Sequence, residues 1–414
     1  MGPLYICGGK PLYGTVEIGG AKNAALPILA ATVLHGGIYA IHNCPEITDV
    51  DLAAQIIETL GGQTARDGRL LLVDTRDLDR WTIPGELMCR MRASVLFLGG
   101  LLARFGRAEL TCPGGCPLGR RPIDLHLEAM AAMGAAVTLQ DGAIRCEAPS
   151  LHGCVFPLSF PSVGATENAV LAAMACQGTV VIENAAREPE IGDLIGFLRA
   201  MGAEIEGAGT GRLEIRGSAP LSDAAYGVMP DRIETATYLC AAAACGGDVT
   251  LRRTDGAYLE PVLEILCQAG CTVERSRSGL RLCSGGELRA VGGVETAPYP
   301  GFPTDAQAPL MAALLRAEGE TRFTETVFER RFSHAAQLRR FGGRIETSGS
   351  TAVVRGVPRL YGAQAEASDL RAAAALVIAA LQAPEESAVF GIKHLHRGYD
   401  NLEGNLRRLG ADIR

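Results

Sequence analysis

The hydrophobic and polar positions of this chain follow a pattern that occurs six times, at intervals of about 70 residues. Each repeat opens on an almost wholly apolar stretch of helical length and continues through an amphipathic helical stretch to a glycine. Polar–apolar alternation follows, which is typical of a strand, and a glycine at that place is typical of a helix C-cap. The six glycines are Gly61, Gly134, Gly202, Gly270, Gly342 and Gly410.

The apolar stretches predict six buried helices, because a helix that is hydrophobic on all sides needs protein around it. A period of about 70 residues is too long for a solenoid repeat and too short for an independent domain, so several repeats must share one core. The predicted helices cover residues 21–34, 91–106, 162–176, 231–245, 304–319 and 368–383.

The two ends of the chain indicate how the repeats are grouped. The sixth repeat stops just after Gly410, and the N-terminal segment 4–23 matches segment 352–371, with a shared Leu-Tyr-Gly, as if it were the missing end of that repeat. With both termini in one domain, we predict one domain over residues 22–229 and a second over residues 1–21 plus 230–414.

Composition narrows the class of protein. The chain has 414 residues, of which 48% are hydrophobic, and a net charge of −7, which does not favour a nucleic-acid partner. Its longest apolar runs are shorter than a membrane span and its start lacks the features of a signal peptide, so we expect a cytoplasmic protein. Thirteen cysteines without a CxxC pair favour reduced thiols, and we expect no metal site.

Several charged or small residues stand at the predicted helix starts. Taken singly, each cation is more often a solvated surface residue, but equivalent helices of a repeat point their N-termini to one end of a domain. Helix N-termini attract anions, so two such domains would form an anion-binding cleft. The residues are Lys22, Arg92, Ser162, Val163, Gly164, Arg232, Asp305, Asp369 and Arg371.

A glycine- and proline-rich segment over residues 112–124 places Cys116 near Arg120 and Arg121. Guanidinium groups at that distance in sequence would stabilise a thiolate. On this segment alone, an incidental loop thiol is the stronger interpretation.

Ten ordered motifs spread over the whole chain resemble those of the UDP-N-acetylglucosamine 1-carboxyvinyltransferases, the enolpyruvyl transferases that begin peptidoglycan precursor synthesis. The motifs are GGAKNAALPILAA from Gly19, MRAS from Met91, PGGCPLGRRPIDLH from Pro113, SVGATEN from Ser162, ENAAREPEI from Glu183, MPDRIE from Met229, YPGFPTDAQA from Tyr299, TETVFERRF from Thr324, SDLRAAAALV from Ser368 and RGY from Arg397.

This resemblance implies a two-domain inside-out α/β barrel of six βαβαββ units, three in each domain, with the active site in the interdomain cleft. It implies transfer of the enolpyruvyl group of phosphoenolpyruvate to the 3-hydroxyl of UDP-N-acetylglucosamine, with release of phosphate and without a cofactor or metal. The role would be in cell-wall biogenesis, cell shape and division, and the antibiotic fosfomycin would alkylate Cys116. The oligomeric state stays open, and a monomer is compatible with the sequence.

The resemblance also implies roles for individual residues. Cys116 matches the acid at the methylene carbon, Asp305 the carboxylate at the sugar 3-hydroxyl, and Asp369 a neighbour of the cysteine. An N-cap of the following helix is the alternative interpretation of Asp305. Lys22, Arg121, Arg331 and Arg397 match the clamp on phosphoenolpyruvate. Positions that match the nucleotide-sugar site are Asn23, Arg92, Arg121, Pro122, Ile123, Asp124, Leu125, Ser162, Val163, Gly164, Asp305 and Val327.

The chain departs from the family pattern at Thr48, Pro117, Arg120, Phe160 and His396. Two other functions remain open. One is 5-enolpyruvylshikimate-3-phosphate synthase, whose class lacks the loop cysteine, and the other is a non-catalytic paralogue that binds the nucleotide sugar and regulates the pathway.

Overall fold

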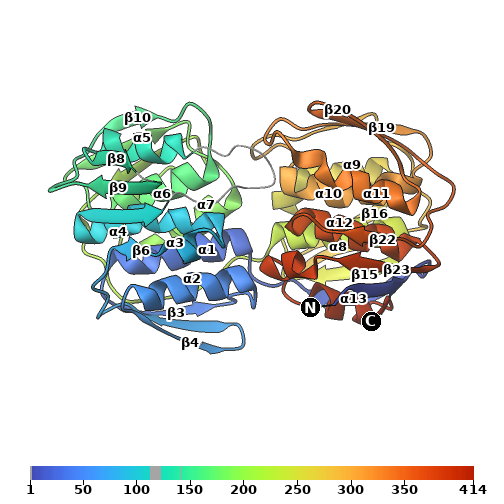
Figure 1. The fold of residues 1–414 in the computed structure, drawn as a ribbon, viewed down its shortest axis with the longest axis horizontal. Coiled ribbons are helices and arrows are strands. Elements are labelled where there is room, and N and C mark those ends of the chain that lie inside the picture. The colour runs from blue at the N-terminus through green and yellow to red at the C-terminus, as the bar shows by residue number, and fades with distance from the viewer. Residues whose placement is uncertain (1, 112–122, 141) are drawn as a thin grey trace. The chain divides into compact units, whose positions relative to one another are not determined.

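The computed structural model describes residues 2–111, 123–140 and 142–414, and the chain divides into two compact units (Figure 1). The central unit consists of the described residues between Gly20 and Met229. The terminal unit joins the two ends of the chain, Met1–Gly19 and Pro230–Arg414. Each unit has its own hydrophobic core.

The central unit begins with a buried helix and then alternates helices with short strands. Its elements are α1 (Lys22–Ala31), η1 (Thr32–Leu34), β3 (Ile38–His42), α2 (Thr48–Thr59), β4 (Gln63–Asp67), β5 (Leu70–Asp74), β6 (Thr82–Ile83), α3 (Gly85–Met88), η2 (Arg92–Leu96), α4 (Phe97–Phe105), β7 (Arg107–Thr111), α5 (Asp124–Ala132), β8 (Ala136–Gln140), β9 (Ala143–Glu147), β10 (Val155–Pro157), α6 (Val163–Ala173), β11 (Thr179–Glu183), α7 (Pro189–Ala200), β12 (Glu204–Glu206), β13 (Arg212–Arg216) and β14 (Ala224–Gly227).

The terminal unit has the same kind of succession, with its first two strands taken from the N-terminus. Its elements are β1 (Leu4–Cys7), β2 (Leu12–Glu17), α8 (Arg232–Cys245), β15 (Gly247–Arg252), η3 (Gly256–Leu259), α9 (Glu260–Gln268), β16 (Thr272–Ser276), β17 (Gly279–Ser284), β18 (Gly293–Glu295), α10 (Thr304–Ala313), η4 (Leu314–Arg316), β19 (Glu320–Thr324), η5 (Arg331–His334), α11 (Ala335–Leu338), η6 (Arg339–Phe341), β20 (Arg344–Ser348), β21 (Thr351–Arg355), β22 (Gln364–Glu366), α12 (Leu370–Gln382), β23 (Glu386–Phe390), η7 (Ile392–Arg397), α13 (Leu402–Arg408) and β24 (Asp412–Ile413).

The strands among the described residues form six four-stranded sheets that share one topology. In each sheet an edge strand pairs in parallel with the second strand, and the remaining two pairings are antiparallel. The sheets of the central unit are β14-β3-β5-β4, β6-β7-β9-β8 and β10-β11-β13-β12. Those of the terminal unit are β2-β15-β17-β16, β18-β19-β21-β20 and β22-β23-β1-β24.

The first strands of the chain complete sheets that begin near its other end. β1 lies between β23 and β24, with Ile6 opposite both Ser387 and Ile413, and β2 pairs in parallel with β15. The prediction that the N-terminal residues supply the missing end of the sixth repeat is therefore confirmed. In the central unit, the last strand, β14, completes the sheet of β3 in the same way, by pairing with β3 in parallel.

Three apolar helices form the centre of each unit, and the sheets lie around them (Figure 1). They are α1, α4 and α6 in the central unit and α8, α10 and α12 in the terminal unit, and nearly all their side chains are buried. The six sequence patterns therefore locate the core helices correctly. The pattern over 91–106 differs in detail, because the chain forms the 3₁₀ turn η2 before α4 begins at Phe97.

The six repeat glycines are all in the left-handed region that favours glycine. Their φ angles run from 91° at Gly342 to 112° at Gly202. Each lies between a helix and the next strand. Gly342 is the C-cap residue of its helix, and the other five glycines directly follow the C-cap residue. Among the described residues, no helix is long and apolar enough to span a membrane.

Candidate active site

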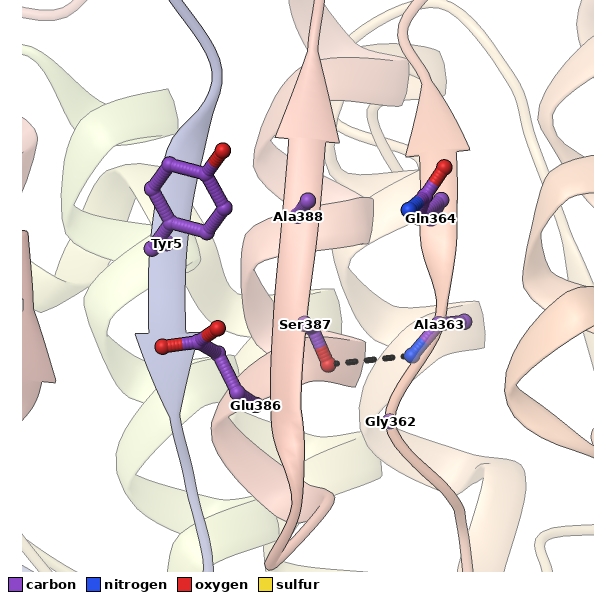
Figure 2. A pocket seen from close by; sticks show the side chains of 7 residues that line it. All are labelled: Tyr5, Gly362, Ala363, Gln364, Glu386, Ser387 and Ala388. Atoms are coloured by element: carbon purple, nitrogen blue, oxygen red, sulfur yellow. Dashed lines mark hydrogen bonds between the residues drawn. The ribbon is translucent and has the colours of Figure 1, made fainter.

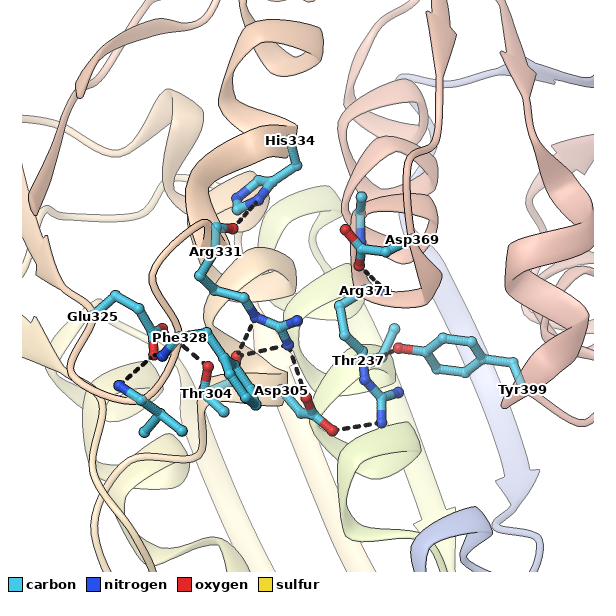
Figure 3. Close-up of polar contacts among 12 residues, drawn as sticks. Thr237, Thr304, Asp305, Glu325, Phe328, Arg331, His334, Asp369, Arg371 and Tyr399 are labelled. Atoms are coloured by element: carbon cyan, nitrogen blue, oxygen red, sulfur yellow. Dashed lines mark hydrogen bonds and ion pairs between the residues drawn. The ribbon is translucent and has the colours of Figure 1, made fainter. Parts of the chain in front are cut away.

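One aspartate and two arginines from three elements of the terminal unit converge at the start of α10 (Figure 3). Oδ1 of Asp305 accepts a hydrogen bond of 2.7 Å from Nη2 of Arg331, and Oδ2 accepts one of 2.9 Å from Nη2 of Arg371. The side chains of Arg331 and Arg371 are 2% and 5% exposed, whereas that of Asp305 is 27% exposed. The carboxylate is therefore the accessible part of this cluster.

The start of α10 also fixes the guanidinium group of Arg331 from a second side. The carbonyl oxygen of Thr304 accepts hydrogen bonds from Nε and Nη2 of Arg331, at 3.3 and 3.1 Å. The hydroxyl of Thr304 donates to Glu325, whose other carboxylate oxygen accepts from the backbone N–H groups of Val327 and Phe328. The loop that leads to Arg331 is thus tied to the same helix start that carries Asp305.

Arg371 lies over an aromatic ring, and its surroundings keep it charged. Its guanidinium carbon is 5.4 Å from the ring centre of Tyr399, whose hydroxyl lies 2.8 Å from that of Thr237. Burial disfavours the cation, but the charge of Asp305, with Tyr399 and Asp231, raises the pKa of Arg371 above its usual value. Nη1 of Arg371 has no acceptor among the described residues, so one buried donor is available for an anion.

Asp369 caps the helix that carries Arg371. Its Oδ1 accepts from the backbone N–H groups of Arg371 and Ala372, at 2.9 and 3.1 Å. The neighbouring His334 is buried, and its Nδ1 lies 3.0 Å from the carbonyl oxygen of Arg331, so Nδ1 carries the proton. Burial, against the opposite effect of Asp369, lowers the pKa of His334 to about 4, and this imidazole is neutral at pH 7.

In the central unit, the first residue of α1 forms a buried ion pair. Nζ of Lys22 lies 2.6 Å from Oδ2 of Asp49, a residue in the first turn of α2. The two side chains are 14% and 4% exposed. Because a charged partner this close orients the ammonium group, Lys22 is held at the helix start rather than extended into solvent.

Three further elements of the central unit, η2, α5 and α6, pack together near His126. A Cβ added to Gly164 would lie 3.2 Å from Cε1 of His126, so the first turn of α6 contacts the imidazole ring directly. Burial, and then the charge of Arg92, lowers the pKa of His126 to about 4, while Asp124 acts in the opposite direction. The structure thus groups Arg92, Asp124 and Gly164, three of the residues predicted to line the nucleotide-sugar site.

Comparisons with known proteins show the family to which this chain belongs. The family model of EPSP synthase (3-phosphoshikimate 1-carboxyvinyltransferase) matches residues 6–406. The UDP-N-acetylglucosamine 1-carboxyvinyltransferase 2 of Caldanaerobacter subterraneus subsp. tengcongensis is 45% identical, and the alignment covers 100% of this chain and 99% of the relative. The UDP-N-acetylglucosamine 1-carboxyvinyltransferase of Thermodesulfovibrio yellowstonii is 44% identical, again over 100% of this chain and 99% of the relative. This chain belongs to the UDP-N-acetylglucosamine 1-carboxyvinyltransferase family.

Solved structures support the fold. The enolpyruvyl transferase NikO from Streptomyces tendae matches 100% of this chain and 99% of its own, with a TM-score of 0.89 and 29% identity. EPSP synthase from Acinetobacter baumannii matches the whole chain with a TM-score of 0.76 and 18% identity, which shows the fold alone. The predicted fold class, an enolpyruvyl transferase α/β fold with six units, is confirmed.

Apart from Arg92, Asp124 and Gly164, which lie near His126, the predicted residues of this family fall into four groups. Lys22, Asp305, Arg331 and Asp369 lie at helix or turn starts with the partners given above. Asn23 follows Lys22 in α1, Val327 lies in the loop before Arg331, and Arg397 ends η7, all half-buried. Leu125, Ser162 and Val163 lie at the starts of α5 and α6, and Ile123 precedes α5. Cys116, Arg121 and Pro122 lie outside the described residues, as do Pro117 and Arg120.

The alternative interpretation of Asp305 as an N-cap is wrong. The N-cap position of α10 is Pro303, no side chain caps this helix, and Asp305 lies in the first turn. Its carboxylate is directed at the two arginines instead (Figure 3).

Several residues that shape the candidate site have roles that the sequence does not indicate. Arg371 stands at a predicted helix start, and Glu325 and His126 lie inside the family motifs, but no local pattern assigns a role to these residues or to Asp49. Asp49 follows a potential cap residue, Thr48, in the first turn of an amphipathic helix, which is a common place for an acidic side chain. Nothing in the local sequence indicates which cation it would pair with.

A separate shallow pocket lies on the strands β1, β22 and β23 of the terminal unit (Figure 2). A hydrogen bond of 3.3 Å from the backbone N–H of Ala363 to Oγ of Ser387 joins two of its walls. None of the seven residues that line it is a predicted site residue; they are Tyr5, Gly362, Ala363, Gln364, Glu386, Ser387 and Ala388.

Among the described residues, no group of three or more His, Cys, Asp and Glu side chains could hold a metal ion.

Proposed function

We propose that this protein transfers the enolpyruvyl group of phosphoenolpyruvate to the 3-hydroxyl of UDP-N-acetylglucosamine and releases inorganic phosphate. The observation that carries the proposal is the accessible carboxylate of Asp305 between two buried guanidinium groups. Such a cluster offers both a proton acceptor and cations for an anionic substrate. The acceptor sugar is inferred from relatives that share 44–45% identity over the whole chain.

The reaction proceeds by addition and then elimination. Asp305 takes the proton of the sugar 3-hydroxyl as its oxygen bonds to C2 of phosphoenolpyruvate, and Cys116 gives a proton to C3. The resulting tetrahedral intermediate then loses a proton from C3 as the bond from C2 to the phosphate oxygen breaks. The enolpyruvyl ether and phosphate are the products, and the step needs no change of oxidation state.

The arginines bind the second substrate in this proposal. Arg331 and Arg371 present buried guanidinium groups side by side on Asp305, and planar donors of this kind suit a carboxylate. Lys22, Arg121 and Arg397 complete the clamp on the carboxylate and phosphate of phosphoenolpyruvate. Asp369 fixes the helix that carries Arg371 and, by family resemblance, also acts next to Cys116.

The ion pairs of Asp305 suggest how the base becomes active. A carboxylate held by two guanidinium groups is a weak base, because both cations favour its charged form. When phosphoenolpyruvate binds, its carboxylate accepts hydrogen bonds from Arg331 and Arg371 that Asp305 accepted before. Asp305 therefore becomes a stronger base when the 3-hydroxyl of the sugar must lose its proton.

The nucleotide sugar is assigned to residues grouped mainly in the central unit. They are Asn23, Arg92, Arg121, Pro122, Ile123, Asp124, Leu125, Ser162, Val163 and Gly164, with Asp305 and Val327 from the terminal unit. The absence of acidic residues from the first turns of α1, η2 and α6 supports an anionic ligand there.

The reaction is the first committed step of peptidoglycan precursor synthesis, and we place it in the cytoplasm. The central and terminal units are proposed to be the two catalytic domains, 22–229 and 1–21 plus 230–414. No cofactor is included in the proposal.

The test is phosphate release from phosphoenolpyruvate in the presence of UDP-N-acetylglucosamine or, in a parallel reaction, shikimate 3-phosphate. The second acceptor is included because the matching family model is described as EPSP synthase. We expect release with the nucleotide sugar only, and its loss in Cys116→Ala. Release with shikimate 3-phosphate only would assign the other acceptor, and tight nucleotide-sugar binding without release would indicate a regulatory paralogue.

A further inference from the structure

The side chain of Asn168, at the centre of the central unit, has only one possible orientation. Its Oδ1 accepts a hydrogen bond of 2.6 Å from the backbone N–H of Gly99, which can only donate. Its Nδ2 donates at 2.9 Å to the carbonyl oxygen of Val95, which can only accept. Two backbone groups therefore settle which amide atom is oxygen and which is nitrogen, an assignment that commonly stays ambiguous.

This orientation determines the tautomer of His126. The second hydrogen on Nδ2 of Asn168 points to Nδ1 of His126, 3.0 Å away, so Nδ1 must be a lone-pair acceptor. A neutral imidazole with a bare Nδ1 carries its proton on Nε2. His126 is only 7% exposed, and burial with the nearby charge of Arg92 keeps the ring neutral at pH 7.

The protonated Nε2 is left without an acceptor among the residues that the structure describes, and it faces the start of α6. A Cβ added to Gly164 would be 3.4 Å from Nε2, and the N-cap of this 11-residue helix is Ser162. The charged groups near the ring are Arg92 from η2 and Asp124 from α5. A fixed neutral donor, a helix N-terminus without acidic residues and a guanidinium group form a site for an anionic oxygen.

We propose that His126 donates a hydrogen bond from Nε2 to a diphosphate oxygen of the nucleotide sugar, and that Asn168 is the positioning residue that fixes the required tautomer. The inference rests on the proposed function for the identity of the ligand, because the structure supplies only the donor and its surroundings. A neutral donor has a specific use here: it binds the anion equally well throughout the neutral pH range, which a titrating histidine would not.

The tautomer is tested first, in the full-length protein without ligand. We expect the ring ¹⁵N shifts of His126 in the wild type to report a neutral ring protonated at Nε2. Asn168→Asp keeps an acceptor for Gly99 but replaces the donor to Nδ1 with an oxygen, so the proton should move to Nδ1. An Nδ1-protonated ring in the wild type overturns the proposal whatever the enzyme catalyses.

The ligand contact is tested by calorimetric titration with UDP and with UDP-N-acetylglucosamine at pH 7.5. We expect His126→Phe to weaken both ligands about tenfold, since a hydrogen bond to a charged group is lost. His126→Gln, whose amide nitrogen can reach the position of Nε2, should recover most of this loss. If His126→Phe and His126→Gln weaken ligand binding equally, the ring contributes packing but no hydrogen bond to the ligand. If binding is unchanged in His126→Phe, the ring does not contact the ligand.

Asn168→Asp adds a readout that loss of packing does not produce. At pH 7.5 it should bind UDP about tenfold more weakly than the wild type, because Nε2 becomes an acceptor facing the phosphate. Its binding should improve as the pH falls, because the doubly protonated ring regains the donor. The matched control is Asn405→Asp, which changes a buried amide of the terminal unit that donates to Tyr238 and should leave UDP binding unchanged.

The two proposals fail in different ways. If the wild type binds UDP but releases no phosphate with UDP-N-acetylglucosamine, the proposed reaction is wrong and the site can still be judged from the variants. If the wild type is active and His126→Phe binds UDP normally, the reaction stands and the role of His126 is wrong. A wild type that does not bind UDP contradicts both.

Discussion

The two units share one topology but differ in the acidic residues at the starts of their core helices. In the terminal unit, each of the three core helices has an aspartate at its start, at the N-cap or in the first turn. The equivalent first turns of the central unit contain no acidic residue. The residues at these starts are Asp231, Asp305 and Asp369 in the terminal unit and Lys22, Arg92 and Ser162 in the central unit.

This difference shows how one repeat can serve two purposes. A helix N-terminus carries about half a positive charge, which remains available to an anionic ligand when no carboxylate neutralises it. The central unit therefore suits the diphosphate of a nucleotide sugar. In the terminal unit the carboxylates occupy the helix starts, and Asp305 gains two buried arginine partners that can turn to a substrate anion.

Removal of one cation from the Asp305 cluster should have the largest effect. We expect Arg331→Met to lower kcat/KM for phosphoenolpyruvate by about 100- to 1,000-fold, because a preorganised donor to the anionic substrate is lost. Arg331→Lys should recover only part of this, since an ammonium group cannot bond to Thr304 and Asp305 in the same geometry. Steady-state phosphate release measures both.

Arg355→Met is the control for Arg331→Met. Arg355 forms ion pairs with Glu320 and Glu346 on the surface of the same unit, so its loss should leave kcat/KM within about twofold. A comparable loss of activity in this variant would show that the unit responds to any lost arginine. The Asp305 cluster would then not be specifically required for activity.

The second largest effect is expected from loss of the Lys22–Asp49 ion pair of the central unit, and it should appear in the free energy of unfolding. Lys22→Met leaves the buried carboxylate of Asp49 without its ammonium partner at 2.6 Å and should lower the free energy of unfolding by about 3 kcal/mol. The double variant Lys22→Met/Asp49→Leu should regain most of it, although it remains inactive. Urea unfolding monitored by circular dichroism gives these values, and a stable single variant would contradict the role of the pair.

Each unit also holds one buried neutral histidine, and both predict a loss of stability in acid. The pKa values of His126 and His334 are lowered to about 4 in the fold, so the unfolded chain binds protons more readily below its ordinary histidine pKa of about 6.5. The free energy of unfolding should be unaffected by either group above that pH. It should fall as the pH drops from about 6.5 to 4, by up to about 1.4 kcal/mol per pH unit for each histidine.

Urea unfolding at pH 7 and pH 5 measures this slope, and His334→Gln and His126→Gln should each reduce it. His152, a more exposed histidine of the central unit, is the control position, and His152→Gln should leave the slope unchanged. A slope that neither buried variant alters would assign the acid sensitivity to other groups.

The smallest effect concerns the helix caps themselves. Asp231 accepts two backbone hydrogen bonds, at 2.8 and 2.9 Å, at the start of α8, and Asp231→Ala should lower the free energy of unfolding by about 1 kcal/mol or more. Ser162 accepts one longer bond, of 3.4 Å, at the start of α6, so Ser162→Ala should lower it by less, about 0.5 kcal/mol. Equal losses would mean that the two sets of helix starts are capped alike.

The repeat could be predicted from sequence because its signals are local. A glycine that ends a helix, as at Gly202, and the apolar stretch that opens each repeat are each fixed by a few adjacent residues. The contacts of the candidate site are not local: Arg371 is 66 positions from Asp305, and Asn168 is 42 from His126. Such pairs depend on how different repeats pack, which the pattern of one repeat does not contain.

The division of tasks between the units is tested most directly by Asp305→Asn. The same preparation is titrated with UDP-N-acetylglucosamine by calorimetry and assayed for phosphate release from phosphoenolpyruvate. We predict binding of the nucleotide sugar within about threefold of the wild type, and phosphate release at least about 100-fold slower, because the base is lost but the central unit is unchanged. Release at the wild-type rate would show that Asp305 is not the base, and a complete loss of binding would show that the nucleotide sugar depends mainly on the terminal unit.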